Sequence, residues 1–266
     1  METKAVLKER ETTDIMITEL ADAHCHLDLI QDPSVISDAI TAGVRTMVTN
    51  GVDTKSNVRA VELSDGRHIF AALGIDPEHA INISGEELEF NIGMIKNNAK
   101  RIVAIGEIGL DYKKAADLKA MERQRAIFEG FLDLAESLNL PVCIHSRNAL
   151  DDVLSITGER NSSKVQIHFF EGNVQQAKEI ERRGYMISVP PLDSGKRTKA
   201  IKEIAIDNIM AESDAPVAGS TPLAVRKSIE MIAAAKAMSF ESAAEAVTLN
   251  TKRFFNLHAK AGLMRA

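Results

Sequence analysis

The chain has 266 residues, of which 45% are hydrophobic and 26% charged, and this composition suits a soluble protein with one sizeable core. The formal net charge of −6 counts against binding nucleic acid over a large basic surface, but not against an enzyme that meets a phosphate only at bound cations. Because no apolar run could span a bilayer and residues 1–13 lack the apolar stretch of a signal peptide, we expect a cytoplasmic protein without a membrane partner.

The sequence divides into a short charged extension, residues 1–15, and one domain, residues 16–266. Within the domain, short runs rich in Val and Ile alternate with longer stretches that have the apolar spacing of amphipathic helices. The predicted strands are Thr18–Ala23, Val44–Asn50, His68–Gly74, Ile102–Glu107, Pro141–His145, Lys164–His168, Tyr185–Val189 and Asn208–Glu212. The predicted helices are Pro33–Ala42, Lys55–Leu63, Gly85–Asn98, Ala116–Leu138, Leu150–Arg160, Val174–Arg183, Gly195–Ile206, Pro222–Ala237 and Glu241–Asn256. Strands that alternate with helices are typical of parallel βα units, and about eight such units close a TIM (β/α)8 barrel; an open doubly wound sheet is the alternative.

Four of the seven histidines lie at the carboxyl ends of predicted strands. His24 and His26 are one residue apart at the end of the first strand, so their side chains share a face and Cys25 points away. Two imidazoles in this arrangement form a chelating pair for a metal ion. His145 and His168 end the fifth and sixth strands. We predict no role for the other three, which are His68, His79 and His258.

Two carboxylates are placed in the same way. Glu107 ends the fourth predicted strand between two glycines, and Asp214 follows the eighth. In a barrel the carboxyl ends of all strands converge on one mouth, where active sites form. Buried carboxylates are unfavourable there unless they are paired, and a bound metal removes that penalty.

These six side chains are too many for one catalytic zinc ion, which keeps about three protein ligands. They suit two divalent cations that share a carboxylate, and Zn, Mn and Mg are all compatible with this mixture of imidazoles and carboxylates. We predict a first ion on His24, His26 and Asp214, a second on His145 and His168, and Glu107 as the bridge. Asp22 and Glu212 either orient the ligand histidines or bind neighbouring backbone groups.

Five segments carry this pattern: Asp22-Ala23-His24-Cys25-His26-Leu27-Asp28, Gly106-Glu107-Ile108-Gly109-Leu110-Asp111-Tyr112, Cys143-Ile144-His145-Ser146-Arg147, His168-Phe169-Phe170-Glu171-Gly172 and Glu212-Ser213-Asp214-Ala215-Pro216. In their order and combination the chain resembles the TatD family of metal-dependent hydrolases, within the amidohydrolase superfamily, from about Ile15 to the last helix. The resemblance implies a TIM barrel, divalent metals on the six residues above and hydrolysis of phosphodiester bonds, commonly in DNA.

Two positions depart from the family's usual pattern. Asp76 stands where the family has a histidine in Gly-x-His-Pro, and Glu171 stands where it has Ser or Thr. Both changes add negative charge near the mouth of the barrel, which should repel a polyanion. The metal ligands therefore carry over more readily than the DNA substrate does.

The predicted reaction is hydrolysis of a phosphodiester, in a nucleic acid or a small molecule, by a metal-activated water. Asp214 is the candidate proton acceptor, with a role as ligand alone as the alternative, and Glu107 acts through the metals it bridges. Arg147 could hold a substrate phosphate; a salt bridge to Asp151 or Asp152 is the other interpretation. Hydrolysis of amides or lactones at the same binuclear site is the alternative function, and metal binding without turnover is a third. The sequence does not indicate the oligomeric state.

Overall fold

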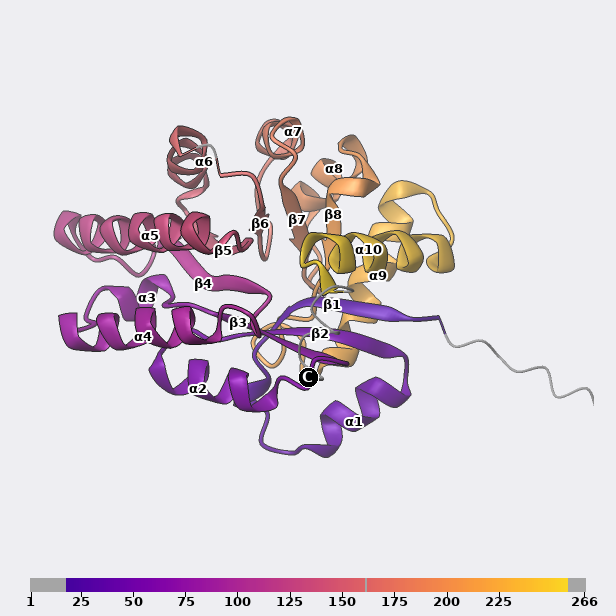
Figure 1. Cartoon of the computed structure of the whole chain (residues 1–266). Coiled ribbons are helices and arrows are strands. Elements are labelled where there is room, and N and C mark those ends of the chain that lie inside the picture. Colours follow the sequence, from indigo (N-terminus) through magenta and orange to yellow (C-terminus); the bar gives the residue numbers. More distant parts are fainter. Residues whose placement is uncertain (1–17, 161, 258–266) are drawn as a thin grey trace, which may run out of the picture.

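A computed structural model describes residues 18–160 and 162–257, so the predicted extension, residues 1–15, and His258 lie outside the described residues. Eight strands form one sheet in consecutive order, and each strand is parallel to the next (Figure 1). They are β1 (Leu20–Cys25), β2 (Val44–Asn50), β3 (Ile69–Leu73), β4 (Ala104–Asp111), β5 (Val142–Arg147), β6 (Val165–Ile167), β7 (Met186–Val189) and β8 (Ile209–Ala211). A doubly wound sheet would reverse its strand order partway, so the consecutive order confirms the predicted barrel.

Helices follow the strands and pack around the sheet (Figure 1). They are α1 (Ser34–Thr41), α2 (Thr54–Leu63), α3 (Pro77–Ala80), α4 (Gly85–Asn98), α5 (Leu118–Leu138), α6 (Leu150–Glu159), α7 (Val174–Arg182), α8 (Gly195–Glu203), α9 (Val225–Lys236) and α10 (Phe240–Phe254). Three 3-10 turns complete the elements: η1 (Leu27–Leu29), η2 (Ile206–Asn208) and η3 (Pro222–Ala224). Among the described residues, no helix combines the length and apolar character that crossing a bilayer requires.

Local signals explain where the longest helix begins and ends. The side chain of Asp117 accepts a hydrogen bond from the Ala120 N–H and caps the start of α5. Asn139, in the left-handed conformation at φ 51°, ends it. Between these caps Ile127 and Phe131 are buried against the sheet. The amphipathic spacing in the sequence is therefore the face that covers the barrel.

The bounds of most predicted elements shift by one to three residues, and three elements differ in other ways. β4 continues four residues beyond the predicted end and reaches Asp111. The short helix α3 was not predicted, because Pro77 at its first position and Asp76 as its cap are equally typical of a turn. The predicted helix Pro222–Ala237 begins as the 3-10 turn η3 before α9.

The seam between the last and first strands is closed by the segment that follows β8. The Asp214 N–H donates to the His24 carbonyl at 3.0 Å, and the His26 N–H donates to the Ala215 carbonyl at 2.7 Å. The Asp22 carboxylate accepts the backbone N–H of Ser213 at 2.8 Å. These bonds place residue 214 directly beside the two histidines of β1.

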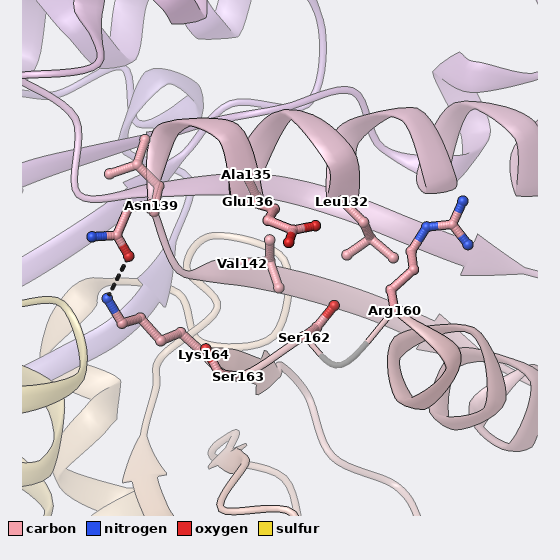
Figure 2. A pocket seen from close by; sticks show the side chains of 10 residues that line it. Leu132, Ala135, Glu136, Asn139, Val142, Arg160, Ser162, Ser163 and Lys164 are labelled. Carbon is pink, nitrogen blue, oxygen red and sulfur yellow. Dashed lines mark hydrogen bonds between the residues drawn. The ribbon is translucent and has the colours of Figure 1, made fainter.

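A small cavity of about 140 Å³ lies between the end of α5, the start of β5 and residues 160 and 162–164 (Figure 2). Two of its charged groups are engaged by neighbours: Arg160 contacts Glu129 and Asp133, and Lys164 donates to Asn139 at 3.1 Å. The cavity is at the amino ends of the strands, opposite the mouth where the chemical groups gather, so it is not the candidate site.

Candidate metal centre

Six ligand-type side chains meet at the carboxyl ends of the strands. They come from β1, β4 and β5 and from the residues just after β1, β6 and β8: His24, Glu107, His145, His26, His168 and Asp214. Five of them are buried, whereas the side chain of His145 is 25% exposed and faces the mouth. All of the side chains predicted as ligands therefore lie together.

The first group surrounds one oxygen of Glu107. Its Oε2 lies 3.2 Å from His24 Nε2 and 3.5 Å from His26 Nε2. Asp214 Oδ1 lies 3.4 Å from His26 Nε2 and 3.9 Å from His24 Nε2. The two imidazole nitrogens are themselves 3.3 Å apart. Each of the two imidazole nitrogens therefore lies within 3.9 Å of an oxygen of Glu107 and of an oxygen of Asp214.

The second group surrounds the other oxygen of the same carboxylate. Glu107 Oε1 lies 2.9 Å from His145 Nδ1 and 3.0 Å from His168 Nε2. These two nitrogens are 3.3 Å apart. Each oxygen of Glu107 therefore faces its own pair of imidazoles.

The donor sets fit divalent cations. Bonds of about 2.0–2.2 Å in a tetrahedron separate neighbouring ligand atoms by roughly 3.3–3.6 Å, and most separations in both groups lie within a few tenths of an ångström of that range. The first group offers four protein atoms and the second offers three. The second group keeps a position open, as catalytic sites do.

Electrostatics also favour cations at this point. Burial opposes ionisation of Glu107, but the surrounding imidazoles of His168, His145 and His24 outweigh it and hold the pKa of the carboxyl well below its usual range. Burial likewise opposes charge on His26 and His145, yet the neighbouring carboxylates raise the pKa of His26 to about 9 and that of His145 to about 10. Carboxylates that stabilise positive charge on the neighbouring imidazoles also attract metal ions, which compete with the imidazole protons.

Asp111 supports the second group and was not predicted to have a role. Its Oδ2 lies 3.3 Å from His145 Nε2, the nitrogen that faces away from Glu107. Its Oδ1 accepts the backbone N–H groups of Lys113 and Lys114 at 2.8 and 3.0 Å. A strand signal was present, because Asp111 and Glu107 are four residues apart and share a face of β4. Carboxylates of this kind fix the orientation of a ligand histidine.

The structure distinguishes the two interpretations given for Asp22 and Glu212, which are orienting a ligand histidine and bonding neighbouring backbone groups. The Asp22 carboxylate accepts bonds from Ser213 and from the His24 backbone N–H, so its contacts are those of the backbone interpretation. Glu212 is fully buried, and its oxygens accept the Phe169 N–H and the Ser188 hydroxyl. One oxygen also lies 3.9 Å from His168 Nδ1. Burial raises the pKa of Glu212 to about 7, against the opposing effect of His168.

Arg147 lies on the exposed rim, two residues beyond His145. The alternative salt bridge is not formed, because Asp151 accepts a bond from Gln176 at 2.7 Å and Asp152 accepts one from the Tyr112 hydroxyl at 2.6 Å. Within the described part of the chain, no ion pair engages the Arg147 guanidinium. It is therefore available to a ligand at the mouth.

Both departures from the family pattern acquire a cationic partner. Asp76 Oδ1 lies 2.7 Å from His79 Nδ1, whose other nitrogen is 3.6 Å from Asp53. Glu171 Oε1 lies 3.7 Å from Arg197, which is almost fully buried. Both contacts offset part of the negative charge that the sequence interpretation assigned to these positions, and the repulsion of a polyanion stays a prediction. His68, for which no role was predicted, bonds the Arg45 carbonyl at 2.8 Å, at the amino end of β3.

The family model, related sequences and a solved structure that match this chain point to the same family. The family model described as TatD related DNase matches residues 21–256. A human relative, "Deoxyribonuclease TATDN3", is 31% identical over 258 residues, covering 89% of this chain and 94% of that protein. The "Uncharacterized metal-dependent hydrolase MJ1582" of Methanocaldococcus jannaschii is 32% identical, with 88% and 96% covered. The crystal structure of YJJV, a TatD homologue of Escherichia coli, superposes with a TM-score of 0.82 at 26% identity, covering 91% of this chain and 99% of that one. The match to nearly the whole chain shows that this protein belongs to the TatD-related DNase family.

Proposed function

We propose that this protein is a metal-dependent hydrolase of phosphodiester bonds with deoxyribonuclease-type activity, and that it works with two divalent cations. The observation that carries the proposal is the division of Glu107, whose Oε2 faces His24 and His26 while Oε1 faces His145 and His168. A carboxylate with both oxygens engaged in this way is suited to bridging two ions.

The assignment follows the two groups of ligand atoms. The first ion would be held by His24, His26 and Asp214, the second by His145 and His168, and both by Glu107. Bound there, such ions lower the pKa of water from about 15.7 towards about 7 and polarise the attacked phosphate. The imidazoles favour Zn or Mn, and the carboxylates also accept Mg.

Two residues of the chain would act on the substrate side. Asp214 is buried beside His24 and His26, and its carboxylate would accept the proton of the attacking water. Arg147, exposed and without an acidic partner in the described chain, would bind a non-bridging phosphate oxygen through its planar guanidinium. Neither role requires a broad basic surface.

We propose DNA as the substrate because the human relative is named a deoxyribonuclease and the family model is described as TatD related DNase. Hydrolysis of amides or lactones was argued from the extra acids Asp76 and Glu171. Since Asp76 lies beside His79 and Glu171 beside Arg197, that argument is weaker than the sequence alone indicated. The cytoplasmic location stays a prediction from the sequence.

A substrate panel tests the proposal directly. The purified protein, loaded in turn with Zn, Mn and Mg, is assayed on single-stranded DNA, a generic phosphodiester and a set of amides and lactones. We expect cleavage of the two phosphodiesters, loss of nearly all of it in Glu107→Ala, and little change in His68→Ala, whose side chain lies at the other end of β3. Turnover of amides or lactones alone would refute the nuclease assignment.

A further inference from the structure

The rings of His24 and His168 stack on one another, although the two residues belong to different ligand groups. Their centroids are 3.9 Å apart and their planes differ by 10°. Each ring directs its Nε2 towards Glu107, His24 to Oε2 and His168 to Oε1. The stack is therefore a direct contact between one ligand of each proposed metal site.

The opposite nitrogens of the same two rings have no hydrogen-bond partner. His24 Nδ1 and His168 Nδ1 are both buried, and no donor or acceptor within the described chain reaches either atom. A histidine that binds a metal through one nitrogen carries a proton on the other. A buried N–H without an acceptor is unfavourable, and ligand histidines almost always donate that proton to a carboxylate, a carbonyl or water.

Glu212 is the carboxylate at this point. Its Oε2 lies 3.9 Å from His168 Nδ1, so a shift of about 1 Å would complete a hydrogen bond. A ligand-type atom of His24 also lies within 4.8 Å of those of His168 and Glu212. The side chain is already held in place, because its oxygens accept the Phe169 N–H at 2.7 Å and the Ser188 hydroxyl at 2.5 Å.

The same three residues could be interpreted as a third metal site. The geometry argues against this, because the Nε2 atoms already face Glu107. Binding another ion through Nδ1 would require each ring to lose its remaining proton. A proton donor facing a carboxylate is the arrangement that agrees with the two groups described above.

We propose that Glu212 is a positioning residue shared by the two metal sites. It accepts the Nδ1–H of His168, and the stacked ring of His24 is held by the same contact. One buried carboxylate thereby sets the orientation of one ligand of each ion. The inference rests on the two-ion assignment of the proposed function, but not on DNA as the substrate.

The substitution Glu212→Gln makes the idea testable. The single amide oxygen should stay with the Phe169 N–H, since that backbone group can only donate. The amide NH₂ then faces Ser188, whose hydroxyl can accept, and also His168 Nδ1–H, which cannot. Two donors are opposed, and the imidazole rotates away from its ligating position.

Metal affinity is the readout, measured for both binding steps with Zn²⁺ against a competing chelator. We expect Glu212→Gln to weaken both steps by about 10- to 100-fold. Asp111→Asn is the matched comparison, because His145 is the one proposed ligand that the Asp111 carboxylate contacts in the described chain, and it should weaken one step. Asn250→Leu controls for general loss of buried hydrogen bonds. Asn250 donates to the Ile206 and Ile209 carbonyls at the amino end of β8, away from the ligand groups, and its replacement should lower stability but leave both affinities within about threefold.

A second readout follows the protons themselves. With ¹⁵N-labelled histidine, the metal-loaded protein should show an Nδ1–H of His168 that exchanges slowly with water, and Glu212→Gln should lose it. Equal affinities in wild type and Glu212→Gln would overturn the proposal. So would weakening of one step alone, or a wild-type protein that binds a single ion. Because no arm measures DNA cleavage, a protein that binds two ions but leaves DNA intact would refute the proposed substrate and not this role of Glu212.

Discussion

Replacing Asp111 with Asn should weaken one metal site and spare the other. Asp111 Oδ2 lies 3.3 Å from His145 Nε2, while His145 Nδ1 faces Glu107 at 2.9 Å. If Nδ1 binds the ion, Nε2 carries the proton, and the Asp111 carboxylate accepts it. The side chain of Asp111 is only 6% exposed, so solvent cannot replace this contact freely.

The expected magnitude follows from the type of bond. A hydrogen bond to a charged group contributes about 1.5–3 kcal/mol, which corresponds to roughly 10- to 150-fold in an equilibrium constant. In the variant the amide oxygen can still accept the N–H groups of Lys113 and Lys114, so the turn after β4 should be retained. The NH₂ group of Asn then faces the His145 N–H, and two donors cannot bond each other. The binding free energy of the second ion therefore loses the whole contribution of this hydrogen bond.

The assay is a two-step metal titration, together with thermal unfolding of the metal-free protein. We expect the affinity for the second ion, which His145 would bind, to fall by one to two orders of magnitude. The affinity for the first ion should stay within about threefold, and thermal stability should change little. Equal loss in both steps, or none, would refute the reasoning, because it would mean that Asp111 does not act through His145.

Three further predictions concern the same mouth of the barrel. Gly109→Ala should destabilise the fold by at least about 2 kcal/mol in denaturant unfolding, since φ is +138° and the new Cβ would lie 2.1 Å from the His145 carbonyl oxygen. Arg147→Ala should raise KM for DNA with kcat nearly unchanged, as loss of uniform binding does, and steady-state kinetics would expose a fall in kcat instead. His79→Ala leaves Asp76 without its partner, so it should raise KM for DNA at low salt more than the double variant Asp76→Ala/His79→Ala does. The difference between the two KM values should fade at high salt, and equal KM values at low salt would dismiss the charge argument.

The alternation of strands and helices predicted parallel βα units, the resemblance to the TatD family favoured the barrel over the open sheet, and the placement of the ligands predicted that they meet. Each ligand lies at or just after the end of an apolar run, and parallel strands bring their carboxyl ends to one mouth whatever the lengths of the helices between them. The alternation in Asp22-Ala23-His24-Cys25-His26 likewise fixed which side chains face inward. Strand order was not accessible in this way, because periodicity reports local structure and carries no information on which strands pair.

The supporting carboxylates show where such reasoning stops. Asp22 is two residues before His24 and shares its face of β1, whereas Glu212 lies two residues before Asp214 but after the end of β8, where strand alternation no longer applies. Only the structure shows that Asp22 bonds Ser213 across the barrel seam, whereas Glu212 approaches His168 on another strand. The difference depends on contacts between strands that are far apart in sequence, and single-strand alternation cannot supply them.

The two paired acids change the electrostatic argument about the substrate. Asp76 adds a carboxylate near the mouth, but its hydrogen bond raises the pKa of His79, so the imidazole gains positive charge where the acid adds negative charge. Glu171 is opposed by the guanidinium of Arg197, which the chain buries and bonds to two backbone carbonyls. Net charge at the mouth therefore changes less than a count of acids indicates. A phosphodiester needs attraction only where its phosphate binds. There the cations held by the ligand groups, together with Arg147, would provide it. A net charge of −6 for the whole chain is therefore compatible with cleavage of DNA.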